Sequence, residues 1–196
     1  MTERGFLDVA VQSAHAFRAI MQAVARPGRV LELGSDLEAP DPLLSSAAAV
    51  ALTLCDFQTP IWLAPELRNE NVIHYLRFHA GAPVTDEPGK AQFLFAMAGE
   101  TWPAPALLMQ GTHEYPDRSA TLVIQVAGFA PGDVVLSGPG ILSSEPFGVA
   151  GLNTSFWAAM VENHARFPIG IDVIFAAPGL VAALPRATEI RLLESV

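Results

Sequence analysis

Hydrophobic and polar positions alternate along the chain in two patterns, one typical of helices and one typical of buried strands. Residues 12–26 carry apolar side chains at helical spacing, and Arg26-Pro27-Gly28 is a strong stop signal. The same pattern predicts further helices over residues 43–54, 66–79, 103–109 and 152–166. Short apolar runs predict strands over residues 30–33, 60–63, 92–96, 121–126, 134–136, 171–175, 179–183 and 188–193.

Helices and almost continuously hydrophobic strands therefore alternate over most of the chain. This alternation is typical of α/β proteins in which helices cover both faces of a sheet. We expect a three-layer α/β/α sandwich with a mixed sheet. Prolines and glycines are spread along the chain, mostly at expected turns and breaks, and are not gathered in a linker. Residues 1–196 are therefore expected to form a single domain.

The composition is unusually apolar, with 51% hydrophobic and 16% charged residues, whereas soluble proteins carry about 25% charged residues. The longest apolar run, residues 46–55, is about half of the roughly 20 residues that a spanning helix needs. The N-terminus has no basic segment followed by an apolar one. We therefore expect no membrane span, and the surplus apolar surface predicts an oligomer or a partner protein.

The net charge of −9 argues against a nucleic-acid partner, because such proteins gather lysine and arginine on one face. Cys55 is the single cysteine, which excludes an internal disulfide and fits a reducing, cytoplasmic compartment. Its place after an apolar run predicts a buried side chain rather than a reactive thiolate.

Motifs for catalysis are missing from the sequence. The histidines lack the spacing of a zinc-binding helix, and no pair of cysteines exists. Nucleotide-binding glycine fingerprints and the Gly-x-Ser-x-Gly pattern of serine hydrolases are also absent. Lys90, the single lysine, lies in a polar turn rather than in a pocket that could hold a Schiff base. We expect no catalytic residue, metal or cofactor in this chain.

Arginines and a glycine turn form a first candidate site, for an anion. Arg18 and Arg26 lie on the first predicted helix and at its end, and guanidinium groups bind phosphate or carboxylate in a bidentate manner. Gly138 and Gly140 frame a turn that could form a small anion nest. Compensation of the helix dipole by Arg26 and an ordinary tight turn explain the same residues equally well.

Residues 111–119 form a second candidate, a functional loop before the strongest predicted strand. The loop contains His113, Glu114, Asp117 and Arg118, which combine an imidazole, two carboxylates and a guanidinium. Such loops often bind or catalyse. A charged surface turn is the simpler interpretation.

Several segments, taken in order, resemble one known family. They are residues 17–28 (FRAIMQAVARPG), 52–63 (LTLCDFQTPIWL), 76–83 (LRFHAGAP), 119–126 (SATLVIQV), 136–141 (LSGPGI), 167–174 (FPIGIDVI) and 184–188 (LPRAT). Together they resemble the PhnH family, the H subunits of the bacterial carbon–phosphorus lyase core complex. The resemblance runs from about residue 10 to residue 192.

The resemblance implies a role in phosphonate use, within a core complex of subunits G, H, I and J. In that system, subunit I, helped by G, H and L, attaches a phosphonate to the ribose of ATP with loss of adenine. Subunit J later breaks the carbon–phosphorus bond. Isolated family members form homodimers, and their fold is similar to that of pyridoxal-phosphate-dependent transferases without the cofactor.

The expected function is therefore a non-catalytic subunit that supports synthesis of ribose 1-methylphosphonate 5-triphosphate. Two alternatives stay open. One is a cryptic module that binds a phosphonate or nucleotide, and the other is a degenerate pyridoxal-phosphate-type enzyme.

Overall fold

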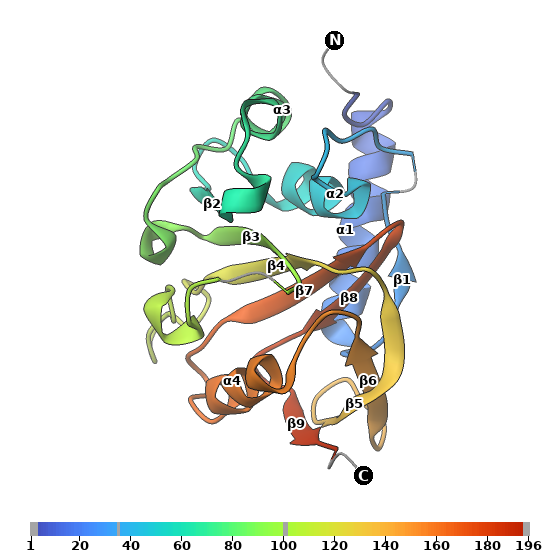
Figure 1. The fold of residues 1–196 in the computed structure, drawn as a ribbon, viewed down its shortest axis with the longest axis vertical. Coiled ribbons are helices and arrows are strands. Elements are labelled where there is room, and N and C mark those ends of the chain that lie inside the picture. Colours follow the sequence, from blue (N-terminus) through green and yellow to red (C-terminus); the bar gives the residue numbers. More distant parts are fainter. Residues whose placement is uncertain (1–3, 35, 100–101, 194–196) are drawn as a thin grey trace.

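The computed structural model describes residues 4–34, 36–99 and 102–193. The described residues form a six-stranded sheet at the centre of the molecule (Figure 1). Its strands, in spatial order, are β1 (Leu31–Glu32), β8 (Leu180–Leu184), β7 (Asp172–Ala177), β4 (Thr121–Gln125), β3 (Phe93–Met97) and β2 (Ile61–Leu63). Strands β2, β3, β4 and β7 run parallel, whereas β8 and β1 are antiparallel to their neighbours. The α/β class and the mixed sheet expected from the sequence are confirmed.

Helices α1 (Val9–Ala25), α2 (Ser45–Leu54) and α3 (Glu70–Ala80) lie on one face of this sheet (Figure 1). Each buries apolar side chains in one core, to which Ile20 of α1, Val50 of α2 and Tyr75 of α3 belong. Polar caps explain where two of them begin. Asp8 accepts a hydrogen bond from the backbone N–H of Val11 at 3.1 Å, which satisfies a free donor in the first turn of α1. Asn69 caps α3 in the same way.

The other face is covered by helix α4 (Thr154–His164) together with a second sheet (Figure 1). In the described part of the chain this sheet has three antiparallel strands, in the order β6 (Glu145–Val149), β5 (Phe129–Ser137) and β9 (Glu189–Leu192). Aromatic side chains of Phe147, Phe156, Trp157 and Phe175 pack between the layers with ring centroids 5.1 to 6.3 Å apart. The expected third layer of helices is therefore partly a sheet.

Several local elements differ from the sequence expectation. The predicted helix over 66–79 is a 3-10 turn at Pro65–Leu67 followed by α3, because Asn69 caps a new helix between them. The predicted helix over 103–109 is a short 3-10 turn at Pro105–Leu107. The predicted strand over 134–136 is the end of the longer β5, and β6 was not predicted.

Candidate functional site

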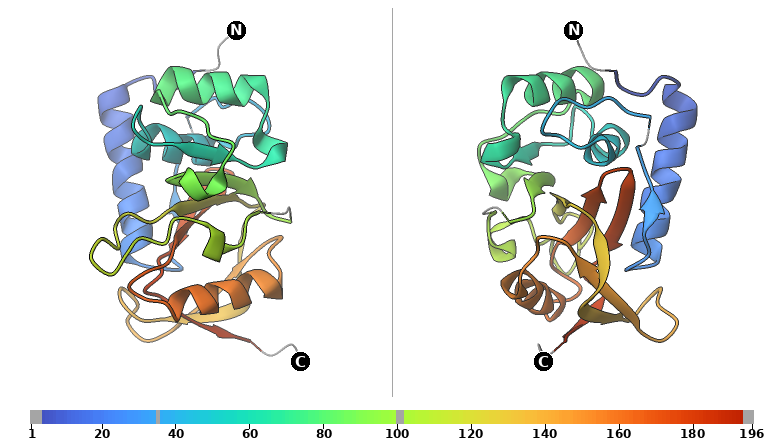
Figure 2. Two further views of the ribbon diagram at one scale, coloured as in Figure 1. Left: turned by 90° about the vertical axis from the view of Figure 1, so that its left-hand side faces the viewer. Right: turned by 45° about the vertical axis from the view of Figure 1, so that its right-hand side comes forward.

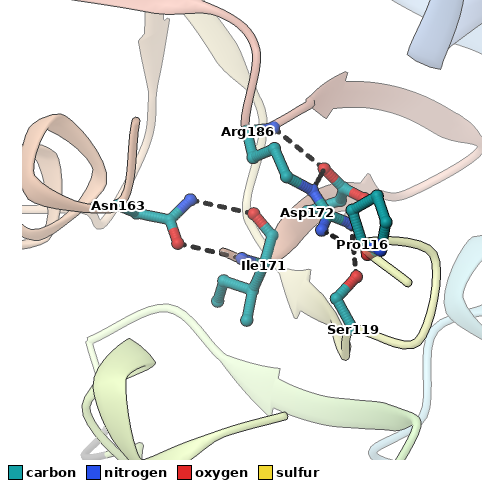
Figure 3. A network of polar contacts seen from close by, with 6 residues as sticks. All are labelled: Pro116, Ser119, Asn163, Ile171, Asp172 and Arg186. Atoms are coloured by element: carbon teal, nitrogen blue, oxygen red, sulfur yellow. Dashed lines mark hydrogen bonds and ion pairs between the residues drawn. The ribbon is translucent and has the colours of Figure 1, made fainter. Parts of the chain in front are cut away.

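A polar network joins the amino ends of β4 and β7 to the connection between β8 and β9 (Figure 3). The guanidinium group of Arg186 binds the carboxylate of Asp172 with Nε to Oδ1 at 3.1 Å and Nη2 to Oδ2 at 2.5 Å. The side chains of Arg186 and Asp172 are 11% and 31% exposed. Bidentate, charge-assisted bonds of this kind fix both groups, particularly where water is largely excluded.

The same arginine holds the 111–119 loop. Its Nη1 donates to the carbonyl oxygen of Pro116 at 2.8 Å, and its Nη2 donates to the hydroxyl of Ser119 (Figure 3). Because Nε, Nη1 and Nη2 of Arg186 all have partners inside the protein, this guanidinium group is a structural anchor rather than an open ligand site.

The predicted residues of this loop lie on the surface. His113, Glu114, Asp117 and Arg118 are all exposed, and the guanidinium carbon of Arg118 lies 4.1 Å from the centre of the Tyr115 ring. None of the four lines any of four hollows found among the described residues, which lie beside Phe6, Val135, Arg26 and Met160. The loop is thus an exposed turn whose base is fixed by Arg186, and its polar side chains do not converge on a shared cavity.

The predicted anion site is brought together only in part. Arg26 and Gly140 line one hollow of about 240 Å³, which also includes Arg29, Leu142 and Glu145. Arg18 lies two turns earlier on α1, and Gly138 opens the turn, yet neither lines this hollow.

The turn itself fits tightly against the end of α1. Gly140 has φ of +85°, and the N–H of Ile141 donates to the carbonyl oxygen of Gly138 at 3.2 Å, as in a type II turn with Pro139 at its second position. A Cβ atom on Gly140 would lie 2.1 Å from the carbonyl oxygen of Ala25. Glycine is therefore required here for close packing of the two segments.

Residues 42–46 bind the carboxyl ends of β4 and β7, at the edge of the sheet where α/β proteins usually bind ligands. Gln125, at the end of β4, donates to the carbonyl oxygen of Pro42 at 2.9 Å and accepts from the N–H of Leu44 at 2.6 Å. Ser46 donates to the carbonyl oxygen of Ala177, at the end of β7. Gln125 is 4% exposed and Ser46 is fully buried. The polar side chains at this edge thus serve to dock α2.

Two residues with nucleophilic side chains lie in unreactive surroundings. Burial raises the pKa of the Cys55 thiol to about 12, and the nearby Asp56 carboxylate adds to this effect. Lys90 is exposed and pairs with Glu87 at 2.7 Å. A nucleophilic thiolate or a desolvated amine would require the opposite arrangement. The described residues also contain no cluster of three or more histidine, cysteine or acidic side chains that could hold a metal.

No helix in the described ranges is long and apolar enough to cross a membrane. Residues 4–191 match the family model of the bacterial phosphonate metabolism protein PhnH. The chain belongs to the PhnH family. A PhnH relative from Rhizobium meliloti (strain 1021), named alpha-D-ribose 1-methylphosphonate 5-triphosphate synthase subunit PhnH, is 39% identical over 186 residues, which are 94% of this chain and 93% of the relative. The putative C-P lyase subunit protein HtxG from Stutzerimonas stutzeri is 32% identical over 178 residues, 90% and 85% of the two chains.

The segments that resemble the PhnH family meet one another in the fold. Ser119, Asp172 and Arg186 come from three of these segments and form the network of Figure 3. Ala25 and Gly140 come from two more and form the close contact at the end of α1. Residues of the PhnH pattern therefore form contacts that hold distant segments of the fold together.

Asp172, Arg186 and Gln125 do not stand out in the sequence as candidate site residues. Asp172 and Arg186 are separated by 14 positions, so helical or strand spacing gives no sign of their contact. Each does border an apolar strand within a segment that resembles PhnH. A charged residue at the border of a buried strand, in such a segment, is the signal that could have pointed to them.

Proposed function

We propose that this chain is a non-catalytic subunit of the carbon–phosphorus lyase core complex. In this role it supports transfer of a phosphonate to the ribose of ATP, which yields ribose 1-methylphosphonate 5-triphosphate. The observation that carries the proposal is membership of the PhnH family over residues 4–191, together with 39% identity to a subunit that bears the name of this synthase.

The arrangement of polar groups supports a role without catalysis. Gln125 and Ser46 are used to dock α2 at the carboxyl edge of the sheet, and Arg186 is used to anchor a loop. The thiol of Cys55 stays protonated at neutral pH because its pKa is about 12. These groups therefore contribute to the fold, and the chemistry belongs to the partner subunits.

The proposed partners are subunits G, I and J of the core complex, in the cytoplasm. We further propose that the isolated chain, as one domain over residues 1–196, forms a homodimer. A likeness to the fold of pyridoxal-phosphate-dependent transferases also stays a proposal. The mixed sheet of the described residues supports it, and the exposed Lys90 favours a version without cofactor.

Growth on methylphosphonate as the phosphorus source tests this function. Deletion of the gene should abolish growth on methylphosphonate while leaving growth on phosphate unchanged, and a plasmid copy should restore it. The purified chain alone should not convert ATP and methylphosphonate, whereas the reconstituted complex should do so only when this chain is present. Normal growth of the deletion strain on methylphosphonate would refute the proposal.

One observation favours a second candidate, a phosphonate- or nucleotide-binding module. Arg26 and Arg29 line the same hollow as the turn at Gly140, and guanidinium groups bind phosphoryl oxygens well. Calorimetric titration of the isolated chain with ATP and with methylphosphonate tests this candidate. Heat that disappears in Arg26→Gln would support it, and absence of heat at millimolar ligand would remove it.

A further inference from the structure

Helix α1 covers the sheet with one face and leaves an almost uncharged face on the outside. Within Val9–Ala25, Arg18 is the one arginine, and the segment contains no lysine, aspartate or glutamate. Ala16, Ile20 and Ala23 are buried against the sheet, whereas Phe17 and Met21 are 50% and 40% exposed. Surface helices normally carry charged side chains on the side away from the core. The outer side of α1 departs from this rule.

The exposed apolar side chains continue beyond the end of α1. Ala14, Phe17, Met21 and Ala25 follow one another at intervals of three or four residues, so they share one side of the helix. At Ala25 the helix meets the turn at Gly140. Figure 2 shows α1 along one side of the molecule, with the connection between β5 and β6 beyond its end.

Leu142 lies in this connection, lines the same hollow as Arg26 and is fully exposed. We call the combined surface of Ala14, Phe17, Met21, Ala25 and Leu142 the α1 face.

Arginines border the α1 face. Arg18 projects from α1 itself, and Arg26 and Arg29 line the hollow at its end. All three are exposed, and within the described ranges none of them forms a hydrogen bond or ion pair through its side chain. Glu145 is the carboxylate that lines the hollow. A chain with a net charge of −9 and only 11 basic residues thus places three unpaired guanidinium groups around one apolar surface.

We infer that the α1 face binds an amphipathic, acidic segment of another core-complex subunit; this inference rests on the proposed function. Apolar side chains of that segment would cover Phe17, Met21 and Leu142. Its carboxylates would pair with the arginines, because guanidinium and carboxylate groups form bidentate bonds and complementary charge favours one partner over others.

Two other occupants of the α1 face are less favourable, a second copy of this chain and an anionic membrane. A second copy related by a twofold axis would bring the same patch to both sides of the interface, so Glu145 would be the one carboxylate that each patch offers to the arginines of the other. A flat anionic membrane would also face the acidic surface outside the α1 face, in a chain with a net charge of −9, whereas a short acidic segment meets the α1 face alone. The alanines at positions 14 and 25 add little apolar area for insertion into lipid, but they allow another helix to approach closely.

Co-purification with subunits G, I and J tests the inference. The tagged chain is co-expressed with these subunits as wild type, as Phe17→Ser with Met21→Ser, and as Arg18→Glu with Arg26→Glu. The matched control is Phe78→Ser with Arg77→Glu, which changes an exposed apolar residue and an exposed arginine on α3. Circular dichroism and thermal unfolding verify that each variant folds.

The wild type and the α3 control should retain the partner subunits, and both α1 variants should bind them at least roughly tenfold more weakly. Association of the wild type should also weaken as salt is raised, because the arginine contacts are exposed to screening. If both α1 variants retain the partners as the wild type does, the inference is wrong while the proposed function stands. If the wild type retains no partner, the proposed function fails, and the inference fails with it.

Two further outcomes identify a different occupant. Loss of self-association in the α1 variants, with the partners still bound, would mean that a second copy covers this face. Binding of the isolated wild-type chain to phosphatidylglycerol vesicles, lost in Phe17→Ser with Met21→Ser, would mean that a membrane does. Either result would overturn the inference.

Discussion

Asp172 accepts three hydrogen bonds from Arg186, one from its backbone N–H at 2.8 Å and two from its guanidinium group. The pair ties the first residue of β7 to the segment that follows β8. Through Pro116 and Ser119, the same arginine also ties the loop before β4. One side chain thus links segments that are up to 70 positions apart in the sequence.

Substitution of Arg186 should strongly destabilise the protein. Arg186→Met leaves the partly buried carboxylate of Asp172 without its counter-charge, and breaking such a pair costs about 3 kcal/mol. Urea unfolding followed by circular dichroism measures the loss. Arg77→Met, at an exposed position on α3, is the control and should change the free energy of unfolding by less than about 0.5 kcal/mol. Equal effects of the two substitutions would contradict the structural role of Arg186.

Gly140→Ala should disrupt the contact between the β5–β6 connection and α1. The positive φ alone costs roughly 1–2 kcal/mol for a residue with a Cβ atom, and the close approach to the carbonyl oxygen of Ala25 adds a steric term. Gly179→Ala separates the two effects, since Gly179 has φ of +71° and, apart from its two chain neighbours, no residue lies within 4 Å of an added Cβ. Thermal unfolding should show a clearly larger loss for Gly140→Ala. Similar losses would mean that the turn can move away from α1.

Gln125→Glu should weaken the docking of α2. A carboxylate can still accept from the N–H of Leu44, but it cannot donate to the carbonyl oxygen of Pro42 and repels it. We expect a loss of about 2 kcal/mol or more in the free energy of unfolding at neutral pH. Gln92→Glu makes the same chemical change at an exposed position and should be nearly neutral. Unchanged stability of Gln125→Glu in urea unfolding would show that this bond is not required.

Cys55 should react slowly with iodoacetamide in the folded protein. The native pKa of about 12 exceeds the ordinary value of 9.0, so little thiolate forms at neutral pH. Because the folded state holds this proton more tightly, the contribution of the group to stability is complete below about pH 9 and is lost as the pH rises towards 12. Mass spectrometry should detect rapid alkylation only after unfolding in urea. Equally rapid labelling of native protein would contradict a buried thiol.

The regular elements of the fold were largely predictable from the sequence because their apolar periodicity is strong. Helix α1 and strands β4 and β7 follow from local patterns alone. Strand β6 was missed because its sequence Glu145-Pro146-Phe147-Gly148-Val149 contains a proline and a glycine, which normally mark a turn. It pairs with the preceding strand β5 as a hairpin, whereas β9 joins the other side of β5 from near the end of the chain, which local patterns do not reveal.

The candidate sites were predictable in residue type but not in arrangement. The sequence pointed to the 111–119 loop, yet the groups that fix it come from Asp172 and Arg186, which are distant in the chain. Arg26 and Gly140 do meet, because the turn packs on the end of α1. Arg18 was grouped with them by nearness in sequence, although helical geometry directs it to the outer side of α1. Contacts between segments that are distant in the sequence therefore decide which candidate residues meet in the fold.

The large sheet ends at both sides in very short strands. β1 spans Leu31–Glu32 and β2 spans Ile61–Leu63, so each edge offers few unpaired backbone groups to a neighbouring chain. Another molecule therefore gains little by extending this sheet strand by strand, and ordered fibre growth along its edges is disfavoured. Recognition at the edges of this sheet must instead rely on side chains, which can distinguish one partner from another in a way that backbone hydrogen bonds cannot.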